Sequence, residues 1–470
     1  MIAATIAFIA AAVFALRYTQ RALVPRPSIS FILFGSLLVI HGIPMLVYLH
    51  LTGPATFIYE AALEPVDAEA VKARMLWALA CMFVSLVIGA ELARLIAPRS
   101  WRYAQLAVAR SSQRGLATVY RATPLMRVAL WLVAAAMLSL ILIEGQPAKI
   151  ANYFVSGETE LDKILLRHES GGSQFYLYNV FLSSLAPFIV IVLWCMYRAD
   201  PKDRQLYALL VCYFTLVLVG KLGSLSKAPP VIFLLQMAIL SFLLKNKPLS
   251  FWPLVRLLVL ALALFSVTVW LTIPGIELGA IFSFLYYRVF DIPNESILEY
   301  FSAFPHSLRF GWEYGVFGSL GRSVQEVILP NYSAVAEITR GSLVSTSNVV
   351  FIGDAWAEYE WLGIFATSLM AGMLTRLIDL YSLRNGRTEE WACLIAGCLL
   401  GLFTMLSTAF STALVTGGLA LIPLVSWLFL RRRRKQFHRR AGAIDAKRVL
   451  RGVVAKQIVA GLGNHMEKRS

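Results

Sequence analysis

Charged residues are scarce in this chain. Asp, Glu, Lys and Arg make up 15% of its 470 residues, and 58% of the residues are hydrophobic. Soluble globular domains contain about 25% charged and about 45–50% apolar residues. This composition excludes an ordinary soluble domain. The apolar residues gather in runs long enough to cross a hydrocarbon layer of about 30 Å, which predicts an all-α polytopic membrane protein.

Cysteine and histidine are also scarce, with five and six residues. All five cysteines fall inside apolar runs, so no disulfide framework is expected. Cys393 and Cys398 lie on one predicted helix without a nearby histidine, which argues against a metal site. The sequence has no Walker loop, no dinucleotide fingerprint, no zinc spacing and no paired-carboxylate metal motif. We therefore expect neither a metal ion nor another cofactor.

The apolar runs predict about eleven transmembrane helices, with ten or twelve as alternatives. Their expected ranges are 2–16, 29–51, 75–97, 128–143, 175–197, 206–220, 231–244, 257–276, 355–378, 391–410 and 411–430. We read the first run as a retained helix rather than a cleaved signal, because Arg17, Arg21 and Arg26 follow it instead of a small-residue cleavage site.

The basic residues predict the orientation of these helices. With the N-terminus outside and the C-terminus inside, most Lys and Arg fall in cytoplasmic segments and most Asp and Glu fall outside. One transmembrane domain, 1–430, then includes a large external loop at 277–354. Residues 431–470 form a cytoplasmic tail with 13 Lys and Arg against two Asp and Glu. Such a tail is expected to contact anionic lipids, and it has almost no aromatic residues for the base stacking that nucleic-acid binding would use.

The external side of this predicted topology nevertheless carries basic residues, contrary to the usual charge bias. Of the eleven Lys and Arg there, six are of interest: Lys221, Lys227, Arg288, Arg309, Arg322 and Arg340. A guanidinium matches the oxygens of a phosphate with two parallel hydrogen bonds, so these residues are candidates for binding a lipid-linked pyrophosphate. The alternative is that they snorkel to the surface or form local ion pairs, for example Arg288 with Asp291 or Glu295.

Three further residues are candidate proton acceptors. His306 titrates near neutral pH and is suited to take a proton from a sugar hydroxyl. Asp354 and Glu358 are four residues apart at a predicted helix start, where they would share one face. The alternatives are a loop histidine without a chemical role, and carboxylates that only complement the positive end of a helix.

The segment around these carboxylates resembles a known family. The spacing Ile-Gly-Asp-x-Trp-x-x-Tyr-x-x-x-Gly from Ile352 to Gly363 is similar to the Ile-Gly-Glu-x-Tyr-x-x-Phe-Gly-x-x-Gly segment of bacterial Wzy-type O-antigen and oligosaccharide repeat-unit polymerases. A small-residue helix follows at 370–374. Upstream, Tyr287-Arg288-Val289-Phe290 and the stretch 300–305 resemble the arginine-containing and aromatic-proline stretches of that family. The resemblance covers about the last 190 residues.

The resemblance implies a metal-independent, inverting-type glycosyltransferase in the bacterial inner membrane, with its active site facing the periplasm. It would transfer an undecaprenyl-pyrophosphate-linked glycan onto a new lipid-linked repeat unit, and a chain-length regulator and a flippase would be possible partners. Arg288 with Arg309 or Arg340 would bind the pyrophosphate, and His306, Asp354 or Glu358 would lie near the acceptor. The alternatives are an O-antigen ligase acting on lipid A core, and a flippase or other transporter.

Two positions depart from the family pattern. Glu360 stands where the family often has glycine, and a stretch that is often Gly-Ser-Arg-Gly-like is here 220–227, with Lys221 and Lys227 in place of arginine. Lysine keeps the positive charge but not the planar fork of donors.

Overall fold

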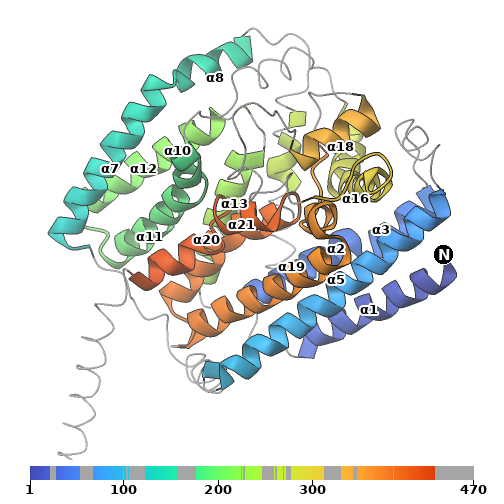
Figure 1. Cartoon of the computed structure of the whole chain (residues 1–470). Helices are drawn as coiled ribbons and strands as arrows, with labels where there is room; N and C mark the ends of the chain where they lie inside the picture. Colours follow the sequence, from blue (N-terminus) through green and yellow to red (C-terminus); the bar gives the residue numbers. More distant parts are fainter. Residues whose placement is uncertain are drawn as a thin grey trace, which may run out of the picture. The chain divides into compact units, whose positions relative to one another are not determined.

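The computed structural model describes residues 1–21, 28–52, 67–98, 100–101, 104, 122–155, 176–223, 225, 228–245, 259, 262–267, 269–270, 277–311, 330–341, 347–384 and 386–428 (Figure 1). Within these ranges the regular elements are helices and none is a β-strand, which confirms the all-α prediction. The chain divides into two compact units, Met1–Ile422 and Pro423–Ser470. The predicted basic tail, 431–470, and its proposed lipid contacts lie outside the described residues.

The helices follow one another along the first unit. Their bounds are α1 Ile2–Arg21, α2 Ile29–His41, α3 Ile43–Val47, α5 Ala68–Ile96, α7 Pro124–Ile143, α8 Gln146–Val155, α10 Tyr176–Val180, α11 Ala186–Ala199, α12 Arg204–Leu222, α13 Ala228–Leu243, α15 Leu278–Tyr286, α16 Ile292–Ala303, α18 Asn331–Arg340, α19 Ile352–Leu383, α20 Glu389–Met405 and α21 Phe410–Leu414. Three π-helical turns occur in the described ranges: η1 Tyr48–Thr52 continues from α3, η2 Phe181–Leu185 joins α10 to α11, and η3 Tyr287–Asp291 joins α15 to α16.

Seven helical stretches in the described ranges are long and apolar enough to cross a membrane: Ile2–Gln20, Ile29–His50, Ala68–Ile96, Pro124–Ile143, Tyr176–Ala199, Arg204–Leu222 and Ile352–Leu383. They coincide with seven of the expected spans. Two other expected spans correspond to the shorter helices α13, with 16 residues, and α20, with 17 residues. The span expected at 257–276 lies largely outside the described residues. A multi-pass helical membrane protein is therefore supported, whereas the count of eleven and the orientation remain predictions.

Side-chain caps fix where several of these helices begin. At each capped start a side-chain oxygen accepts a hydrogen bond from a backbone N–H of the first turn, which otherwise has no partner within the helix. The capping residues are Ser28 for α2, Asp67 for α5, Thr123 for α7, Asp203 for α12 and Thr388 for α20. These caps explain why the helices start at the polar residues that interrupt the apolar runs.

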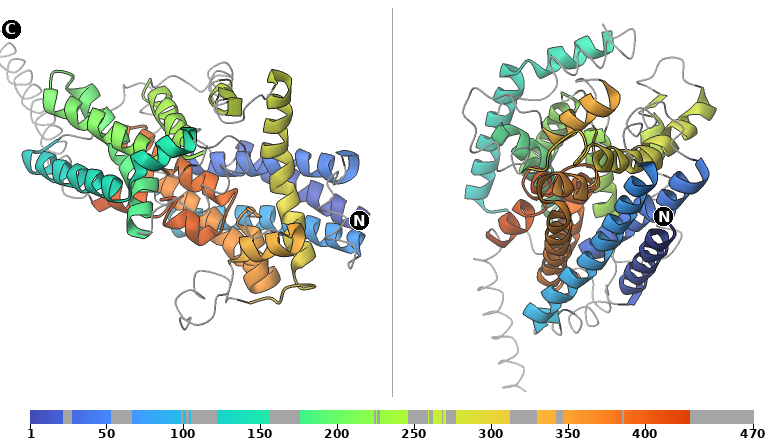
Figure 2. Two further views of the ribbon diagram at one scale, coloured as in Figure 1. Left: turned by 90° about the horizontal axis from the view of Figure 1, so that it is seen from above. Right: turned by 45° about the vertical axis from the view of Figure 1, so that its right-hand side comes forward.

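Two glycines allow α5 and α19 to pack closely. A Cβ at Gly89 would lie 2.0 Å from the backbone oxygen of Leu369, and a Cβ at Gly372 would lie 2.1 Å from that of Leu86. Small residues at such crossings let the backbones of membrane helices approach each other. Figure 1 and Figure 2 show α5 and α19 running alongside each other, with α1 on the other side of α5. The helix that carries the family resemblance is thus fixed against the N-terminal helices.

The C-terminal end of α2 holds α16 in place. The buried ring of His41 makes a hydrogen bond of 2.7 Å, through Nδ1, to the side-chain oxygen of Asn294. The amide nitrogen of Asn294 donates in turn to the carbonyl of Ile40 at 3.1 Å. Because α16 carries Glu299 and Tyr300, this contact fixes the position of polar side chains described below.

Candidate functional site

The resemblance segment contains a sharp break in helix α19. Tyr359 (φ −139°, ψ 20°) and Glu360 (φ 53°, ψ −137°) leave the helical conformation. Beyond the break the chain turns so tightly that a Cβ at Gly363 would lie 2.0 Å from the carbonyl oxygen of Ala355. Residues 352–358 therefore form a short helix separate from the long membrane helix. The φ of Glu360 lies in a region that favours glycine, and glycine is the residue that the family in the resemblance often has at this position.

Aromatic contacts bring the 300–311 segment against this short helix. The ring of Trp356 stacks on Phe301 with a centroid distance of 4.7 Å, and it meets the ring of Phe310 edge-on at 5.0 Å. The backbone N–H of Gly311 donates to the carbonyl of Ala357 at 3.1 Å. Two stretches that are separate in the sequence, both part of the resemblance, thus form one structural unit. We call this unit, together with α16 and α18, the Asp354 site.

Asp354 lies at the centre of a hydrogen-bond network in the Asp354 site. Its Oδ1 accepts from the hydroxyl of Tyr300 at 3.3 Å and from the amide nitrogen of Asn331 at 3.2 Å. Burial raises the pKa of Tyr300 well above its ordinary value, and the charge of Asp354 adds to the shift. The phenol therefore stays protonated and acts as the donor. These two contacts join α16, α18 and α19 at one carboxylate.

A buried ion pair lies in the same site. The guanidinium of Arg340 donates to both carboxylate oxygens of Glu299, at 2.8 Å from Nε and 3.0 Å from Nη2. The hydroxyl of Ser347 donates to the same carboxylate at 2.5 Å. Burial raises the pKa of Glu299, although Arg340 and Ser347 act in the opposite direction. The local ion pair considered as an alternative for the external arginines is therefore formed by Arg340, with Glu299 as its partner.

Glu358 lies one helical turn after Asp354 and is half-buried. The two carboxylates are close enough for their charges to repel each other. Within the described part of the chain, Glu358 has no hydrogen-bond or ion-pair partner, whereas Oδ1 of Asp354 already accepts two hydrogen bonds. Of the two carboxylates, Glu358 is therefore the one more open to a hydroxyl group of a ligand.

The other predicted residues occupy different surroundings. Arg288 is exposed in η3, and its guanidinium carbon lies 5.2 Å from the centre of the Phe284 ring. Burial raises the pKa of Tyr287, Glu295 adds to this shift, and the charges of Arg340 and Arg288 oppose it. Both arginines therefore lie close enough to Tyr287 for their charges to affect its phenol.

His306 and Arg309 are exposed and lie in the segment that Phe304 and Phe310 hold against Trp356. Lys221 belongs to another part of the fold, where α12 packs against α7, α8 and α11. It is 4% exposed, and its Nζ donates to the carbonyl of Ser183 at 3.4 Å. Lys227 and Arg322 lie outside the described residues. Lys221 is thus not among the residues that the described contacts bring to the Asp354 site, and its pyrophosphate role remains a prediction.

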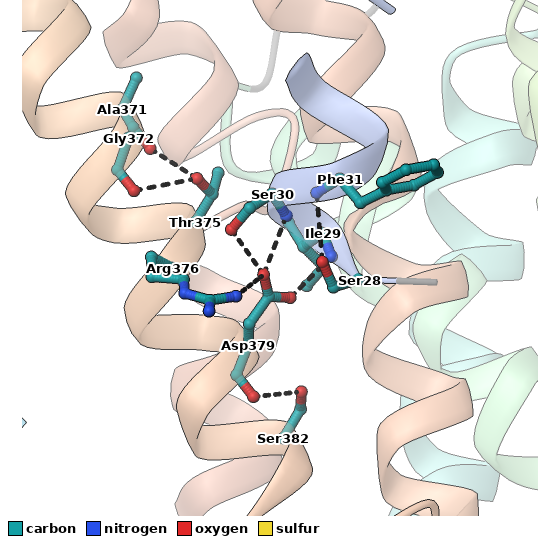
Figure 3. Close-up of polar contacts among 10 residues, drawn as sticks. All are labelled: Ser28, Ile29, Ser30, Phe31, Ala371, Gly372, Thr375, Arg376, Asp379 and Ser382. Carbon is teal, nitrogen blue, oxygen red and sulfur yellow. Dashed lines mark hydrogen bonds and ion pairs between the residues drawn. The ribbon is translucent and has the colours of Figure 1, made fainter. Parts of the chain in front are cut away.

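A second polar cluster lies at the opposite end of α19 (Figure 3). Asp379 accepts from the backbone N–H groups of Ile29 and Ser30, at 2.6 and 3.1 Å, and from the hydroxyl of Ser30 at 2.5 Å. Arg376 Nη1 lies 3.9 Å from the same carboxylate, and its guanidinium lies over the ring of Trp101 at 4.4 Å. Asp379 thus satisfies the first N–H groups of α2 and anchors that helix to α19.

Sequence reasoning missed several members of both clusters. Glu299 and Asn331 occur in segments with no charge pattern that singles them out, so only their contacts in space reveal them. Tyr300 belongs to the resemblance stretch 300–305, but the sequence did not indicate its hydrogen bond to Asp354. Arg376 and Asp379 did leave a signal, because ionisable residues inside an apolar helix are costly and face the protein interior. Their spacing of three residues on one helix predicts that they lie on the same face.

Within the described ranges, no group of three or more His, Cys, Asp or Glu side chains is arranged to hold a metal ion. No family model matches the chain, and neither a curated protein nor a solved structure matches it. The function is therefore argued from the Asp354 site and from the sequence resemblance.

Proposed function

We propose that this protein is a membrane glycosyltransferase that polymerises lipid-linked glycan repeat units. The observation that carries the proposal is the meeting of the resemblance segments in one site. Tyr300 in the aromatic stretch donates to Asp354 in the Ile352–Gly363 segment, and Trp356 packs on Phe301. A carboxylate without a hydrogen-bond partner in the described residues, Glu358, lies one turn away. Such an arrangement suits a reaction on a hydroxyl group at a membrane surface.

In the proposed reaction the acceptor is a hydroxyl at the non-reducing end of a lipid-linked repeat unit. Glu358 takes the hydroxyl proton while the hydroxyl oxygen forms a bond to the anomeric carbon of the donor glycan. The bond from that carbon to the pyrophosphate oxygen breaks, and the bonding electrons leave with polyprenyl pyrophosphate. Attack from the face opposite the leaving group inverts the anomeric configuration. The atoms and charges balance without a metal or nucleotide.

The leaving group gains negative charge, which nearby cations would stabilise. Arg288 and Arg309 are exposed and suited to this role. Arg340 already donates to both carboxylate oxygens of Glu299 through Nε and Nη2, so in this proposal it holds α18 against α16. His306, in the same segment as Arg309, would orient the acceptor sugar. The reaction would take place on the periplasmic side of a bacterial inner membrane, with undecaprenyl-pyrophosphate-linked oligosaccharide as the substrate.

Glu358 and Glu360 provide a matched pair for a first test. Both are glutamates in the same segment, but Glu358 is half-buried beside Asp354 and Glu360 is exposed. In vesicles supplied with polyprenyl-pyrophosphate-linked repeat units, Glu358→Gln is expected to lower the rate of chain extension by about 10²–10⁴-fold, the range for loss of a general base. Glu360→Gln should retain the wild-type rate. Equal rates for both variants would remove Glu358 from the proposed role.

A further inference from the structure

An apolar groove opens between α1 and α5. It has a volume of about 670 Å³, and its lining includes Ala7, Ala10 and Ala11 of α1, Trp77 and Cys81 of α5, and Trp361 of α19. The alanines make the hollow because their side chains leave space that larger residues would fill. The tryptophans form its walls. The polar reaction described above does not use this groove.

Trp361, which lines the groove, also contacts the Asp354 site. Trp361 follows directly after the break at Tyr359 and Glu360. Its ring meets the ring of Trp356 edge-on at 5.5 Å, and Trp356 stacks on Phe301 in the site. A contact between two aromatic rings therefore joins the wall of the groove to the short helix that carries Asp354 and Glu358. A ligand with an apolar tail and a polar head would be able to reach both.

A cation lies on the same face of α5 as the groove. Arg74 precedes Trp77 by three residues and Cys81 by seven, and these spacings repeat on one side of an α-helix. Nη1 of Arg74 is buried and, within the described residues, has no hydrogen-bond partner. In contrast, the nearby Lys72 is paired with Glu69 at 3.2 Å. A guanidinium nitrogen without a partner beside an apolar groove favours a ligand with an anionic oxygen.

We propose that this groove binds the polyprenyl tail of the substrate and that Arg74 binds the phosphate attached to that tail. In a polyprenyl phosphate the phosphate is joined directly to a single apolar chain. This matches the protein, where Arg74 lies directly before the residues of α5 that line the groove. A phospholipid instead separates its phosphate from two tails by a glycerol unit, which fits this spacing less well. The inference rests on the proposed function for the identity of the lipid and adds the location of its tail.

Cys81 allows a direct test that does not depend on polymerisation. Cys81 lines the groove and is half-buried, and Cys212 on α12 is also half-buried but does not line it. The full-length protein in lipid nanodiscs is treated with a membrane-permeant maleimide, and the alkylation rate of each cysteine is followed by mass spectrometry. Undecaprenyl phosphate is expected to slow alkylation of Cys81 at least fivefold and to leave the rate at Cys212 unchanged. If Cys81 proves unreactive, Ala10→Cys at an exposed groove position takes its place.

A control lipid and matched variants show whether protection of Cys81 is specific for undecaprenyl phosphate bound in the groove. Phosphatidic acid at the same concentration should give no protection. Equal protection by phosphatidic acid, or none by undecaprenyl phosphate, would overturn the proposal.

Arg74→Ala should raise the undecaprenyl phosphate concentration needed for half-protection by about 10-fold, as expected for loss of one charge-assisted contact. Ala10→Phe should abolish protection of Cys81, whereas Ile9→Phe, at an exposed position on another face of the same helix, should not.

This test separates the groove from the enzymatic activity. Protection of Cys81 in a protein that makes no polymer would support the groove and contradict the proposed function. Polymer formation without protection would support the function and contradict the groove.

Discussion

Arg340 and Glu299 form a two-pronged ion pair between α18 and α16, with contacts of 2.8 and 3.0 Å. The side chain of Glu299 is 4% exposed and that of Arg340 is 19% exposed. A pair this buried is costly to break, because the remaining partner keeps its charge without compensation. The pair therefore links two short helices of the Asp354 site more firmly than a surface ion pair would.

The first prediction concerns this pair. Arg340→Ala is expected to lower the free energy of unfolding by about 3–5 kcal/mol, because Glu299 then stays buried without its cation. The double variant Arg340→Ala/Glu299→Ala should lose less than the sum of the two single variants. Denaturant unfolding in mixed micelles measures these values. Arg309→Ala, at an exposed arginine, is the control and should change stability by less than about 0.5 kcal/mol. Additive losses would show that the pair does not couple the helices.

The second prediction concerns pH. Burial raises the pKa of Glu299 in the folded state above its unfolded value of about 4.3. The folded protein then binds a proton more tightly than the unfolded chain, so the contribution of Glu299 to stability is largest at acid pH. This contribution declines as the pH rises from about 4.3 through the raised folded pKa. The stability of the wild type relative to Glu299→Gln, followed by thermal unfolding between pH 4 and pH 8, should fall across this window. A difference that grows with pH would contradict the shift.

The third prediction concerns the helix break. Glu360 has a φ of 53°, a conformation that costs a residue with a Cβ about 1–3 kcal/mol. Glu360→Gly should therefore raise the free energy of unfolding by about 1 kcal/mol. This is the relief of strain minus the extra conformational entropy that glycine loses on folding. Glu360→Ala keeps the Cβ and should give no such gain, so the pair of variants separates the backbone effect from the loss of charge. Equal stability of the two variants would argue against strain at this position.

The fourth prediction concerns the crossing of α5 and α19. Gly372→Leu should destabilise the protein by at least about 3 kcal/mol, because the new side chain would meet the backbone of Leu86 rather than a movable side chain. Gly35→Leu is the matched control, since a Cβ at Gly35 has no atom within 4 Å. Thermal unfolding and the yield of monodisperse protein report both effects. A tolerated leucine at Gly372 would contradict the close packing.

The fifth prediction concerns Arg288. Arg288→Ala should reduce chain extension by about 10²–10³-fold, similar to other losses of a group that stabilises transition-state charge, while the protein level stays normal. Arg288→Lys should also be impaired, because lysine lacks the planar fork. Arg204→Ala, at an exposed position at the start of α12, is the control. Glycan length distributions on gels measure the outcome, and wild-type lengths in Arg288→Ala would remove this residue from the site.

Hydropathy was enough to predict the long helices, because an apolar run must bury its backbone groups in a helix to cross a membrane. The spacing of carboxylates, aromatic residues and glycines singled out the segment from Ile352 to Gly363. The sequence did not reveal that Glu299 is the partner of Arg340, because the two residues are 41 positions apart and their contact depends on how α16 and α18 pack. Glu360 was recognised as a departure from the family pattern, and only its φ shows what glycine would supply there.

The most direct test of the account uses the purified protein in lipid, supplied only with undecaprenyl-pyrophosphate-linked repeat units. No nucleotide sugar, lipid A or added metal is present, and the products are separated on a gel. A repeat-unit polymerase should give a ladder spaced by one repeat unit, with the energy supplied by the lipid pyrophosphate. No ladder, with substrate that a control polymerase extends, would contradict the proposed function, and transfer to added lipid A core would identify a ligase instead.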